Sequence, residues 1–203
     1  MKPVVHVVDD DESFLRSVSR LLRASGYEVA TFSSVHGFLQ REEPSAPGCV
    51  VTDLQMPRQD GLDLQEALAR SRNPLPVVFL TSKGDIPTTV RAMRGGAEDF
   101  LTKRAPRAQL LQAIERALDR GNREKQARER GASAEAKLKS LSPRERQVLA
   151  GVARGLLNKE IAGELGVAER TVKLHRSNLS AKLGLRSAAE LALFARESGV
   201  AGT

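Results

Sequence analysis

VVHVVDDDES (residues 4–13) joins a short apolar run to three consecutive aspartates, Asp9, Asp10 and Asp11. The apolar run has the length and composition of a buried β-strand. Like charges crowded at the end of a buried strand repel one another unless they gain a partner. The stretch therefore predicts a polar site at the carboxyl end of this strand, to which other parts of the chain contribute.

Four more apolar runs of strand length follow before residue 118, separated by amphipathic segments. The expected strands are 4–8, 28–32, 49–53, 76–80 and 99–101, and the expected helices are 12–25, 34–41, 61–71, 87–95 and 106–120. Strands that alternate with helices indicate a parallel sheet covered on both faces. We therefore expect residues 1–118 to form an α/β doubly wound domain with a five-stranded parallel sheet, of the flavodoxin-like type.

Polar residues stand at four of the five expected strand ends. Asp9 and Asp10 follow the first strand, Asp53 ends the third, Thr81 follows the fourth, and Lys103 comes just after the fifth. The carboxyl ends of parallel strands meet at one edge of the sheet, where ligands bind in this architecture. Single aspartates often only cap strand ends or helix N-termini, but polar groups at four strand ends together favour a site.

The acidic cluster suits a hard divalent cation, because Mg²⁺ prefers carboxylate oxygens and brings phosphate oxygens with it. Next to such an ion, Asp53 can act as a nucleophile towards a phosphoryl group and form an acyl phosphate. Thr81 and Lys103 can then donate a hydroxyl and a positive charge to the phosphoryl oxygens. We expect Asp11 to stabilise the start of the following helix instead of binding metal.

Composition and charge indicate which partners and which cellular location to expect. The 203 residues carry a net charge of +7, of which residues 1–118 carry none, residues 119–140 carry +3 and residues 141–203 carry +4. The C-terminal half is therefore the candidate for a polyanionic partner, although a solvated basic surface is the simpler alternative.

No apolar run is long enough for a membrane span, so we expect a cytoplasmic protein with no membrane association. Cys49 is expected to be a buried, reduced thiol.

The polar segment 119–140 predicts a charged, partly helical linker in which Gly121 and Gly131 are candidate breaks. After it, residues 141–203 show no strand pattern and predict four helices. Ser142 and Glu145 have the spacing of a capping box at the start of the first of these helices. The segments NKEIAGELG and AERTVKLHRSNLSAKLG are two helices joined through a glycine-containing turn, which is the pattern of a helix-turn-helix.

The longer of these two segments predicts a helix over 169–183 with one buried stripe. Val172, Leu179 and Leu183 share one face, whereas Lys173, Leu174 and Ser177 lie away from it. An exposed leucine is common on any surface, but a helix docked in the major groove can place it against a thymine methyl group. Together with the helix-turn-helix pattern and the basic charge, this arrangement favours DNA recognition.

The motifs VVDDD, TDLQMPRQDGLDL, FLTSKGDIP and DFLTK, followed by LSPRERQVLAGVARGLLNKEIAGELGVAERTVKLHRSNLSAKLGLRS, resemble a two-component response regulator of the FixJ/NarL class over nearly the whole chain. The resemblance implies a receiver domain and an output domain with a LuxR-type helix-turn-helix. It implies that Asp53 is the phosphoacceptor and that Asp9, Asp10, Asp53 and the Gln55 carbonyl bind Mg²⁺. It also implies that Thr81, Phe100 and Lys103 form the switch set.

For the output domain, the resemblance assigns base reading to Lys173, Leu174 and Ser177. Backbone contacts to DNA are expected from Asn158, Lys159, Thr171, His175, Arg176 and Lys182. Receiver dimerisation on phosphorylation is expected near 87–104, through Val90 and Arg94. The expected partners are double-stranded DNA, a sensor histidine kinase, a second copy of the chain and RNA polymerase.

The loop TKRAP (102–106) departs from the family pattern, which usually has proline directly after the pocket lysine. Because Arg104 occupies that place, we expect a trans peptide between Lys103 and Arg104. Pro106 is then expected to open the fifth helix, where its missing N–H is harmless. Lys83, two residues after Thr81, adds a further unusual charge beside the pocket.

The sequence thus predicts a receiver domain at 1–118, a linker at 119–140 and a DNA-binding domain at 141–203, and a transcription regulator rather than an enzyme. Two other functions stay open. A phosphohydrolase would turn over a phosphate ester with Asp53 or Asp9 as its nucleophile. A binding module that needs no phosphate would bind DNA equally well with and without a phosphoryl analogue.

Overall fold

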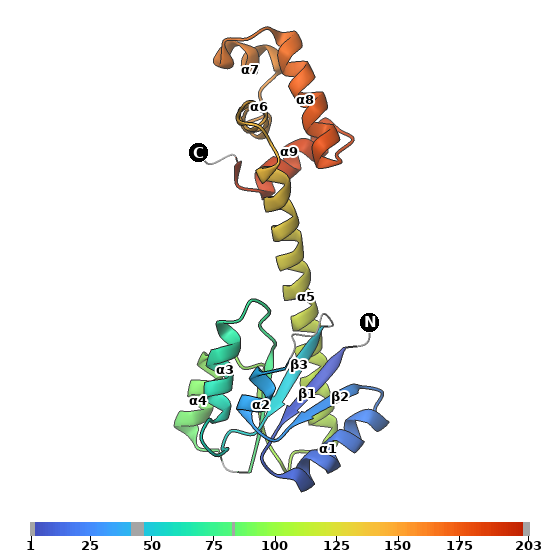
Figure 1. Cartoon of the computed structure of the whole chain (residues 1–203), viewed down its shortest axis with the longest axis vertical. Helices are drawn as coiled ribbons and strands as arrows, with labels where there is room; N and C mark the ends of the chain where they lie inside the picture. The colour runs from blue at the N-terminus through green and yellow to red at the C-terminus, as the bar shows by residue number, and fades with distance from the viewer. Residues whose placement is uncertain (1–2, 42–46, 83, 201–203) are drawn as a thin grey trace. The chain divides into compact units, whose positions relative to one another are not determined.

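The computed structural model describes residues 3–41, 47–82 and 84–200 of the chain (Figure 1). They belong to two compact units, residues 1–126 and residues 127–203. The N-terminal unit contains a sheet with helices on both faces, and the C-terminal unit is helical.

The N-terminal unit alternates strands and helices as the sequence predicts. Its strands are β1 Val4–Val8, β2 Glu28–Phe32, β3 Gly48–Thr52, β4 Val77–Thr81 and β5 Asp99–Thr102. Its helices are α1 Glu12–Ala24, α2 Val35–Leu39, α3 Gly61–Ala69 and α4 Ile86–Arg94, and α5 Arg107–Lys139 follows the last strand. All strand pairs are parallel, in the order β2-β1-β3-β4-β5. This is the doubly wound order of flavodoxin-like domains, so the expected fold class is confirmed.

Each face of the sheet is covered by its own hydrophobic cluster. Val5, Cys49 and Val78 are buried in the cluster that includes residues of α1 and α5. Val8 and Phe79 point to the other face and pack with residues of α2, α3 and α4. Cys49 is a buried free thiol, and burial raises the pKa of this thiol to about 12. The two buried layers explain why the central strands read as nearly continuous apolar runs.

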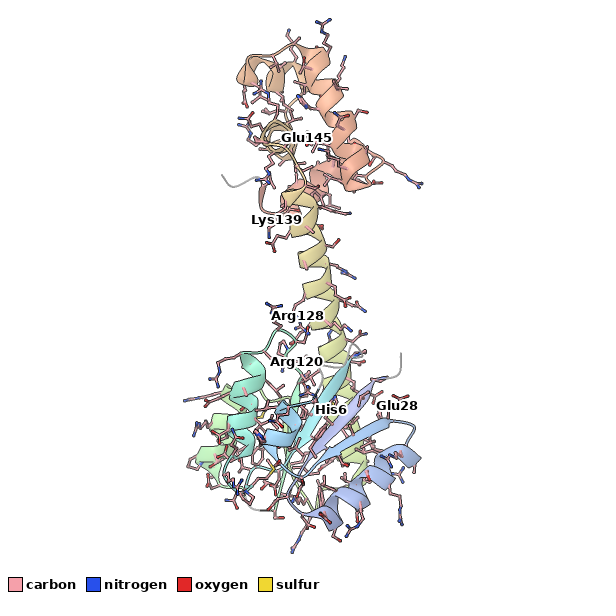
Figure 2. All side chains as sticks on the ribbon, viewed as in Figure 1. His6, Glu28, Arg120, Arg128, Lys139 and Glu145 are labelled. Carbon is pink, nitrogen blue, oxygen red and sulfur yellow. The ribbon has the colours of Figure 1, made fainter. Side chains whose placement is uncertain are left out.

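His6 is the buried histidine of β1, and only 3% of its surface is exposed (Figure 2). Its ring lies near those of Phe32 and Phe38, with centroids 6.0 and 5.6 Å away. Neither ring nitrogen has a hydrogen-bond partner among the described residues. Burial, assisted by the charge of Arg41, lowers the pKa of His6 to about 4, so the imidazole is neutral at pH 7.

Aspartates begin three helices that follow sheet strands. Asp11 caps α1 by accepting hydrogen bonds from the backbone amides of Ser13 (2.8 Å) and Phe14 (3.1 Å). Asp60 caps α3 in a capping box, and Asp85 caps α4. The expected role of Asp11 is therefore confirmed, and these bonds lower the pKa of its carboxyl.

The loop after β5 and the start of α5 differ in one detail from the expectation. The predicted trans peptide between Lys103 and Arg104 is confirmed, because the described residues contain no cis peptide bond. However, α5 begins at Arg107, so Pro106 precedes the helix instead of opening it. The Pro106 carbonyl accepts hydrogen bonds from the amides of Gln109 (2.9 Å) and Leu110 (3.3 Å), which is the role of an N-cap carbonyl.

Helix α5 continues through both glycines that the sequence suggested as breaks. Gly121 is buried, and a Cβ atom there would lie 3.1 Å from the carbonyl oxygen of Gly48 and 3.1 Å from Cδ of Pro76. This close approach accounts for a glycine inside a helix. From residue 122 to residue 139 no side chain of α5 is buried. Neither α5 nor another helix in the described ranges has the length and apolar character to cross a membrane.

The C-terminal unit contains the four predicted helices, α6 Pro143–Ala153, α7 Asn158–Leu165, α8 Glu169–Leu183 and α9 Ala188–Glu197. Its core includes Leu149, Ile161 and Leu179. Gly151 permits close packing, since a Cβ atom there would lie 2.7 Å from Cγ1 of Ile161. Gly166 ends α7 in the left-handed conformation, with a φ of 63°. That turn lets α7 and α8 form a helix-turn-helix.

Candidate acidic site and nucleic-acid interface

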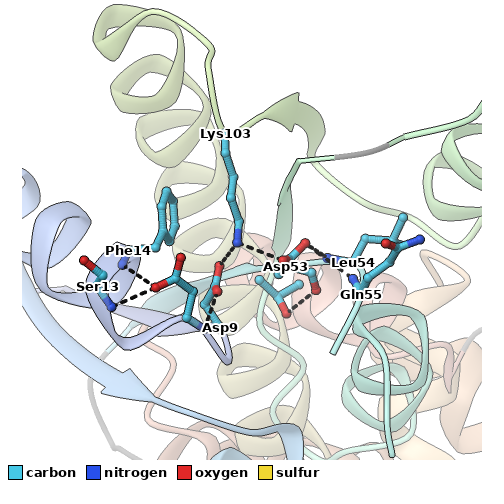
Figure 3. Close-up of polar contacts among 9 residues, drawn as sticks. Asp9, Ser13, Phe14, Asp53, Leu54, Gln55 and Lys103 are labelled. Carbon is cyan, nitrogen blue, oxygen red and sulfur yellow. Dashed lines mark hydrogen bonds and ion pairs between the residues drawn. The ribbon is translucent and has the colours of Figure 1, made fainter. Parts of the chain in front are cut away.

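The acidic site lies at the carboxyl ends of β1 and β3, where the sequence places it (Figure 3). Asp9 and Asp53 are buried, with 1% and 7% of their surfaces exposed, and Asp10 beside them is exposed. Each of the three contributes a carboxylate oxygen to a group in which all oxygens lie within 4.8 Å of one another. Adjacent parallel strands bring together residues that are more than forty positions apart in the chain.

Lys103 contributes the positive charge of the site. Its Nζ lies 2.6 Å from Oδ2 of Asp9 and 2.8 Å from Oδ2 of Asp53, so the ammonium bridges the two buried carboxylates (Figure 3). The same Nζ lies 4.4 Å from the centroid of the Phe14 ring, a cation–π distance. The backbone amide of Lys103 donates to the Thr81 carbonyl at 2.8 Å and so ties the end of β5 to that of β4.

The charges of the site act on one another. Burial raises the pKa of Asp9, and the hydrogen bonds from Lys103 and from the Asp11 amide only partly oppose this effect. Burial also disfavours the charged form of Lys103, but the hydrogen bonds to Asp53 and Asp9 outweigh it and raise the pKa of Lys103. The lysine is therefore cationic throughout the neutral pH range.

The Asp53 side chain is held by contacts on both of its oxygens. Oδ1 accepts hydrogen bonds from the backbone amides of Leu54 (2.6 Å) and Gln55 (3.4 Å), whereas Oδ2 faces Lys103. The backbone amide of Asp53 donates to the Val8 carbonyl at 2.9 Å, which continues the pairing of β3 with β1. The carboxylate is thus oriented, buried and beside a positive charge, as a nucleophile for phosphoryl transfer requires.

These residues fit a hard divalent cation. Three clustered carboxylates face one ammonium, so the site keeps a negative charge at pH 7. The Asp10 side chain forms no hydrogen bond or ion pair with another described residue, which leaves its oxygens available. The main chain of Gln55 passes beside the cluster, as its amide contact with Asp53 shows. Carboxylate and carbonyl oxygens are the ligands that Mg²⁺ prefers.

Thr81 ends β4, whereas Phe100 is the second residue of β5 and pairs in register with Phe79. Thr81 is buried and Phe100 is partly buried, with its ring centroid 5.7 Å from that of Phe79. A Cβ atom added to Gly84 would lie only 2.8 Å from Cε1 of Phe100 and 3.6 Å from Cγ2 of Thr81. Gly84 therefore packs directly over the Phe100 ring, a contact that sequence reasoning missed. Lys83 lies outside the described residues.

The dimer residues expected on α4 are both exposed there. Val90 is 42% exposed, and Arg94 stands in the last turn of the helix. The structure adds two exposed apolar residues that were not predicted, Ile86 at 81% and Met93 at 43%. Ile86, Val90 and Met93 follow the spacing i, i+4 and i+7, so they form one apolar stripe, called here the α4 stripe.

The predicted base-reading residues share the exposed face of α8. Lys173, Leu174 and Ser177 are all exposed, and the Leu174 surface is 60% accessible. On the opposite side of the helix, Val172, Leu179 and Leu183 are buried, as expected. Nζ of Lys173 lies 3.1 Å from Oε1 of Glu169, an ion pair within the first turns of the helix.

Three of the residues expected to contact phosphate, Asn158, Arg176 and Lys182, bind other residues of the C-terminal unit. Arg176 donates a 2.7 Å hydrogen bond to Oδ1 of Asn158 and so connects α8 to the start of α7. Lys182 forms a 2.8 Å ion pair with Glu145. Glu145 is a buried residue of α6 and is labelled in Figure 2.

The other three expected phosphate contacts differ in exposure. Lys159 is exposed near the start of α7. Thr171 and His175 are partly buried on α8. The pairings of Arg176 and Lys182 were missed because they join residues far apart in the sequence, and no local spacing signals them.

Comparisons with known proteins agree with this architecture. Residues 5–115 match the family model of the response regulator receiver domain, and residues 139–195 match that of bacterial regulatory proteins of the luxR family. Nodulation protein W of Bradyrhizobium diazoefficiens is 42% identical over 199 residues, which cover 98% of this chain and 88% of that protein. The transcriptional regulatory protein FixJ of Azorhizobium caulinodans is 39% identical over 199 residues, 97% of this chain and 93% of the relative.

Solved structures lead to the same class. The response regulator StyR superposes with a TM-score of 0.88 at 47% identity, over 97% of this chain and 100% of that one. Full-length FixJ from B. japonicum gives a TM-score of 0.58 at 36% identity, over 98% of both chains. The fold and the acidic site define a receiver joined to a helix-turn-helix domain. The chain belongs to the two-component response regulators that carry a luxR-type DNA-binding domain.

Proposed function

We propose that a partner histidine kinase transfers a phosphoryl group to Asp53 and that this modification controls dimerisation and sequence-specific DNA binding. The observation that carries the proposal is the bridge from Lys103 to Asp9 and Asp53, beside the free carboxylate of Asp10. An oriented carboxylate, an acidic cluster and a nearby cation are the components that phosphoryl transfer to aspartate needs.

In the proposed reaction, a carboxylate oxygen of Asp53 forms a bond to phosphorus while the bond from phosphorus to the kinase histidine breaks. Mg²⁺ held by Asp9, Asp10, Asp53 and the Gln55 carbonyl would supply positive charge to the phosphoryl oxygens. Lys103 would move from its bridge between the carboxylates to a phosphoryl oxygen, and the Thr81 hydroxyl would donate to another. The product is an acyl phosphate on Asp53.

We propose that the rearrangement of Lys103 and Thr81 on phosphorylation is transmitted to α4 through Phe100. Lys103 and Phe100 lie on the same segment, and Phe100 contacts the chain at Gly84, just before α4. The α4 stripe, together with Arg94, is the surface proposed to pair with a second copy of the chain. Its three exposed apolar side chains support this role, because adjacent exposed apolar residues favour an interaction site over a solvated face.

For the output domain, we propose that α8 enters the major groove with Lys173, Leu174 and Ser177 against the base edges. Lys159, Thr171 and His175 would contact phosphates, and the Arg176–Asn158 hydrogen bond would hold the two motif helices in register. The pairing of Lys182 with Glu145 supports a structural role for that lysine more than a phosphate contact.

We propose the same division into domains as the sequence suggests: receiver 1–118, linker 119–140 and DNA-binding domain 141–203. The end of the buried stretch of α5 at Gly121 supports a receiver boundary near this position. RNA polymerase is proposed as a further partner of the DNA-bound dimer.

Incubation of the full chain with a small phosphodonor and Mg²⁺, followed by peptide mapping, tests the proposed reaction. Label should appear on Asp53, and Asp53→Asn should abolish it. Asp60→Asn is a matched control in the same loop, because asparagine keeps the capping acceptor of α3, and this variant should be labelled normally. Label on another residue, or unchanged labelling of Asp53→Asn, would rule out the assignment.

A further inference from the structure

Four cationic side chains lie on α8, and the other residues of the unit engage three of them. The engaged pairs are Lys173 with Glu169 (3.1 Å), Arg176 with Asn158 (2.7 Å) and Lys182 with Glu145 (2.8 Å). The fourth is Arg170, whose exposed guanidinium forms no hydrogen bond or ion pair within the described ranges. Helix α8 therefore offers one uncommitted guanidinium, and nothing in the fold of the unit uses it.

Arg170 stands on the face of α8 that the base-reading residues occupy. It precedes Leu174 by one helical turn and Ser177 by two, and at 100° per residue it lies within about 40° of each of them around the helix axis. All three side chains are exposed. Arg170 also lies in the first turn of α8, and the N-terminal residues of a recognition helix are those that contact base edges.

The neighbouring lysine is less available than this arginine. Lys173 must release the Glu169 carboxylate before its ammonium can meet a base, whereas Arg170 has no such partner to leave. Arginine also presents two parallel N–H groups, which match O6 and N7 of guanine in the major groove. Lysine offers a single point charge and discriminates less strongly between bases.

We propose that Arg170 is a specificity-determining residue of the DNA interface and that it recognises a guanine in the major groove. The inference rests on the proposed function of α8 and goes beyond it, because neither the DNA contacts expected from the sequence nor those proposed above include Arg170. A phosphate contact is the competing role, and it differs in a measurable way. Loss of a base contact lowers discrimination between sequences, whereas loss of a phosphate contact weakens binding to all sequences alike.

The test uses the full-length chain and two duplexes of equal length: one enriched from a random-sequence library by the wild-type protein, and a scrambled version of it. Arg170→Ala should lower affinity for the enriched duplex by about 5-fold to 150-fold and affect the scrambled duplex far less. Arg170→Lys should not restore discrimination, because lysine lacks the planar fork. Lys173→Ala should cost less discrimination than Arg170→Ala. A repeated selection with Arg170→Ala should lose a guanine preference at one position.

Arg196→Ala is the matched control, since it removes an exposed arginine of α9 whose side chain forms no hydrogen bond or ion pair with the described residues. It should leave the ratio of the two affinities unchanged. Equal weakening of both duplexes by Arg170→Ala would reassign Arg170 to phosphate, and unchanged binding would remove it from the interface. If the wild-type chain enriches no sequence at all, the proposed DNA-binding function itself fails, which is distinguishable from either result.

Discussion

The Nζ of Lys103 lies 2.8 Å from Oδ2 of Asp53, so the cation after β5 is paired with the carboxylate at the end of β3. The same Nζ also contacts Asp9 at 2.6 Å. In this arrangement the lysine neutralises part of an acidic cluster that a divalent cation would otherwise neutralise. A cation bound by these carboxylates would therefore act on the same two groups as Lys103, which gives a first prediction.

Lys103→Met should lower the free energy of unfolding at pH 7 by about 1–3 kcal/mol, because it leaves two buried carboxylates without their cationic partner. Added Mg²⁺ should stabilise this variant more than the wild-type chain. Urea unfolding of the wild-type and variant chains, followed by a signal from the receiver domain with and without Mg²⁺, measures both free-energy differences. Lys139→Met is the control, because it removes an ion pair whose side chains are 72% and 67% exposed. This variant should change neither the free energy of unfolding nor its response to Mg²⁺ by much. An equal Mg²⁺ effect in Lys103→Met and wild type would contradict the prediction.

The buried His6 predicts acid sensitivity of the receiver. Its folded-state pKa of about 4 lies below the ordinary value of 6.5, so between these pH values the unfolded chain binds a proton that the folded chain does not. Stability is therefore fully present above pH 6.5 and falls towards pH 4, by about 3 kcal/mol from this residue. Unfolding free energies measured from pH 7 to pH 4 should fall less steeply in His6→Leu.

His36 provides the matched control for this measurement, since it is exposed on α2. His36→Leu should keep the wild-type pH dependence. If His6→Leu and wild type lose stability in parallel as the pH falls, His6 is not the source of the acid sensitivity.

The Lys182–Glu145 ion pair predicts a structural effect without a DNA effect. The hydrogen bond from Lys182 lowers the pKa of Glu145 to about 2, so the stabilisation is present above pH 4.5 and is lost as the pH falls through about 2. At pH 7, Lys182→Met should lower the stability of the output domain by about 1–3 kcal/mol. It should leave the slope of log affinity for DNA against log salt concentration unchanged.

Lys159→Met is the comparison for the salt dependence, because Lys159 is exposed at the start of α7 and is proposed to contact phosphate. Loss of one phosphate contact should reduce the slope by about 0.9. A similar reduction of the slope in Lys182→Met would instead show that Lys182 contacts DNA.

The α4 stripe predicts how dimerisation can be separated from phosphorylation. Val90→Glu places a charge in the middle of the stripe and should abolish dimerisation in the presence of a phosphoryl analogue, while Asp53 is labelled at the wild-type rate. Sedimentation of the full chain measures the first effect and peptide mapping the second. Leu39→Glu adds the same charge at an isolated leucine on α2 that is 41% exposed, and should leave dimerisation intact. Unchanged dimerisation of Val90→Glu would exclude the stripe as the interface.

Much of the fold was predictable from local pattern. The bounds of β1 and β2 agree with those expected, and β3 and β4 differ by one residue, because short apolar runs between polar segments fix strands with little ambiguity. The acidic residues could be placed together because parallel topology aligns the carboxyl ends of the strands. Asp11 was expected to stabilise the start of the first helix because it stands there, and Ser142 was expected to cap its helix because of its spacing from Glu145; both cap their helices.

Other features depended on packing between distant residues. No local signal indicated that Gly121 would fit against Gly48 in a continuous helix, since glycine usually marks a break. The bonds from Arg176 to Asn158 and from Lys182 to Glu145 join positions 18 and 37 residues apart. His6 looked like one more residue of an apolar strand, and only the surrounding aromatic rings give its imidazole an unusual environment.

The uneven burial of α5 also bears on how the chain would be cleaved. Six residues between Leu110 and Gly121 are buried, but none from 122 to 139, so hydrogen bonds within the helix largely maintain its later turns. Such turns open locally at low cost in free energy, whereas the earlier ones open only when the sheet loses its covering helix. The later turns also carry six lysine and arginine residues, which are the sites that trypsin cuts. Brief trypsin digestion should therefore divide the folded protein within 122–139 and release two fragments, each of which retains its hydrophobic core.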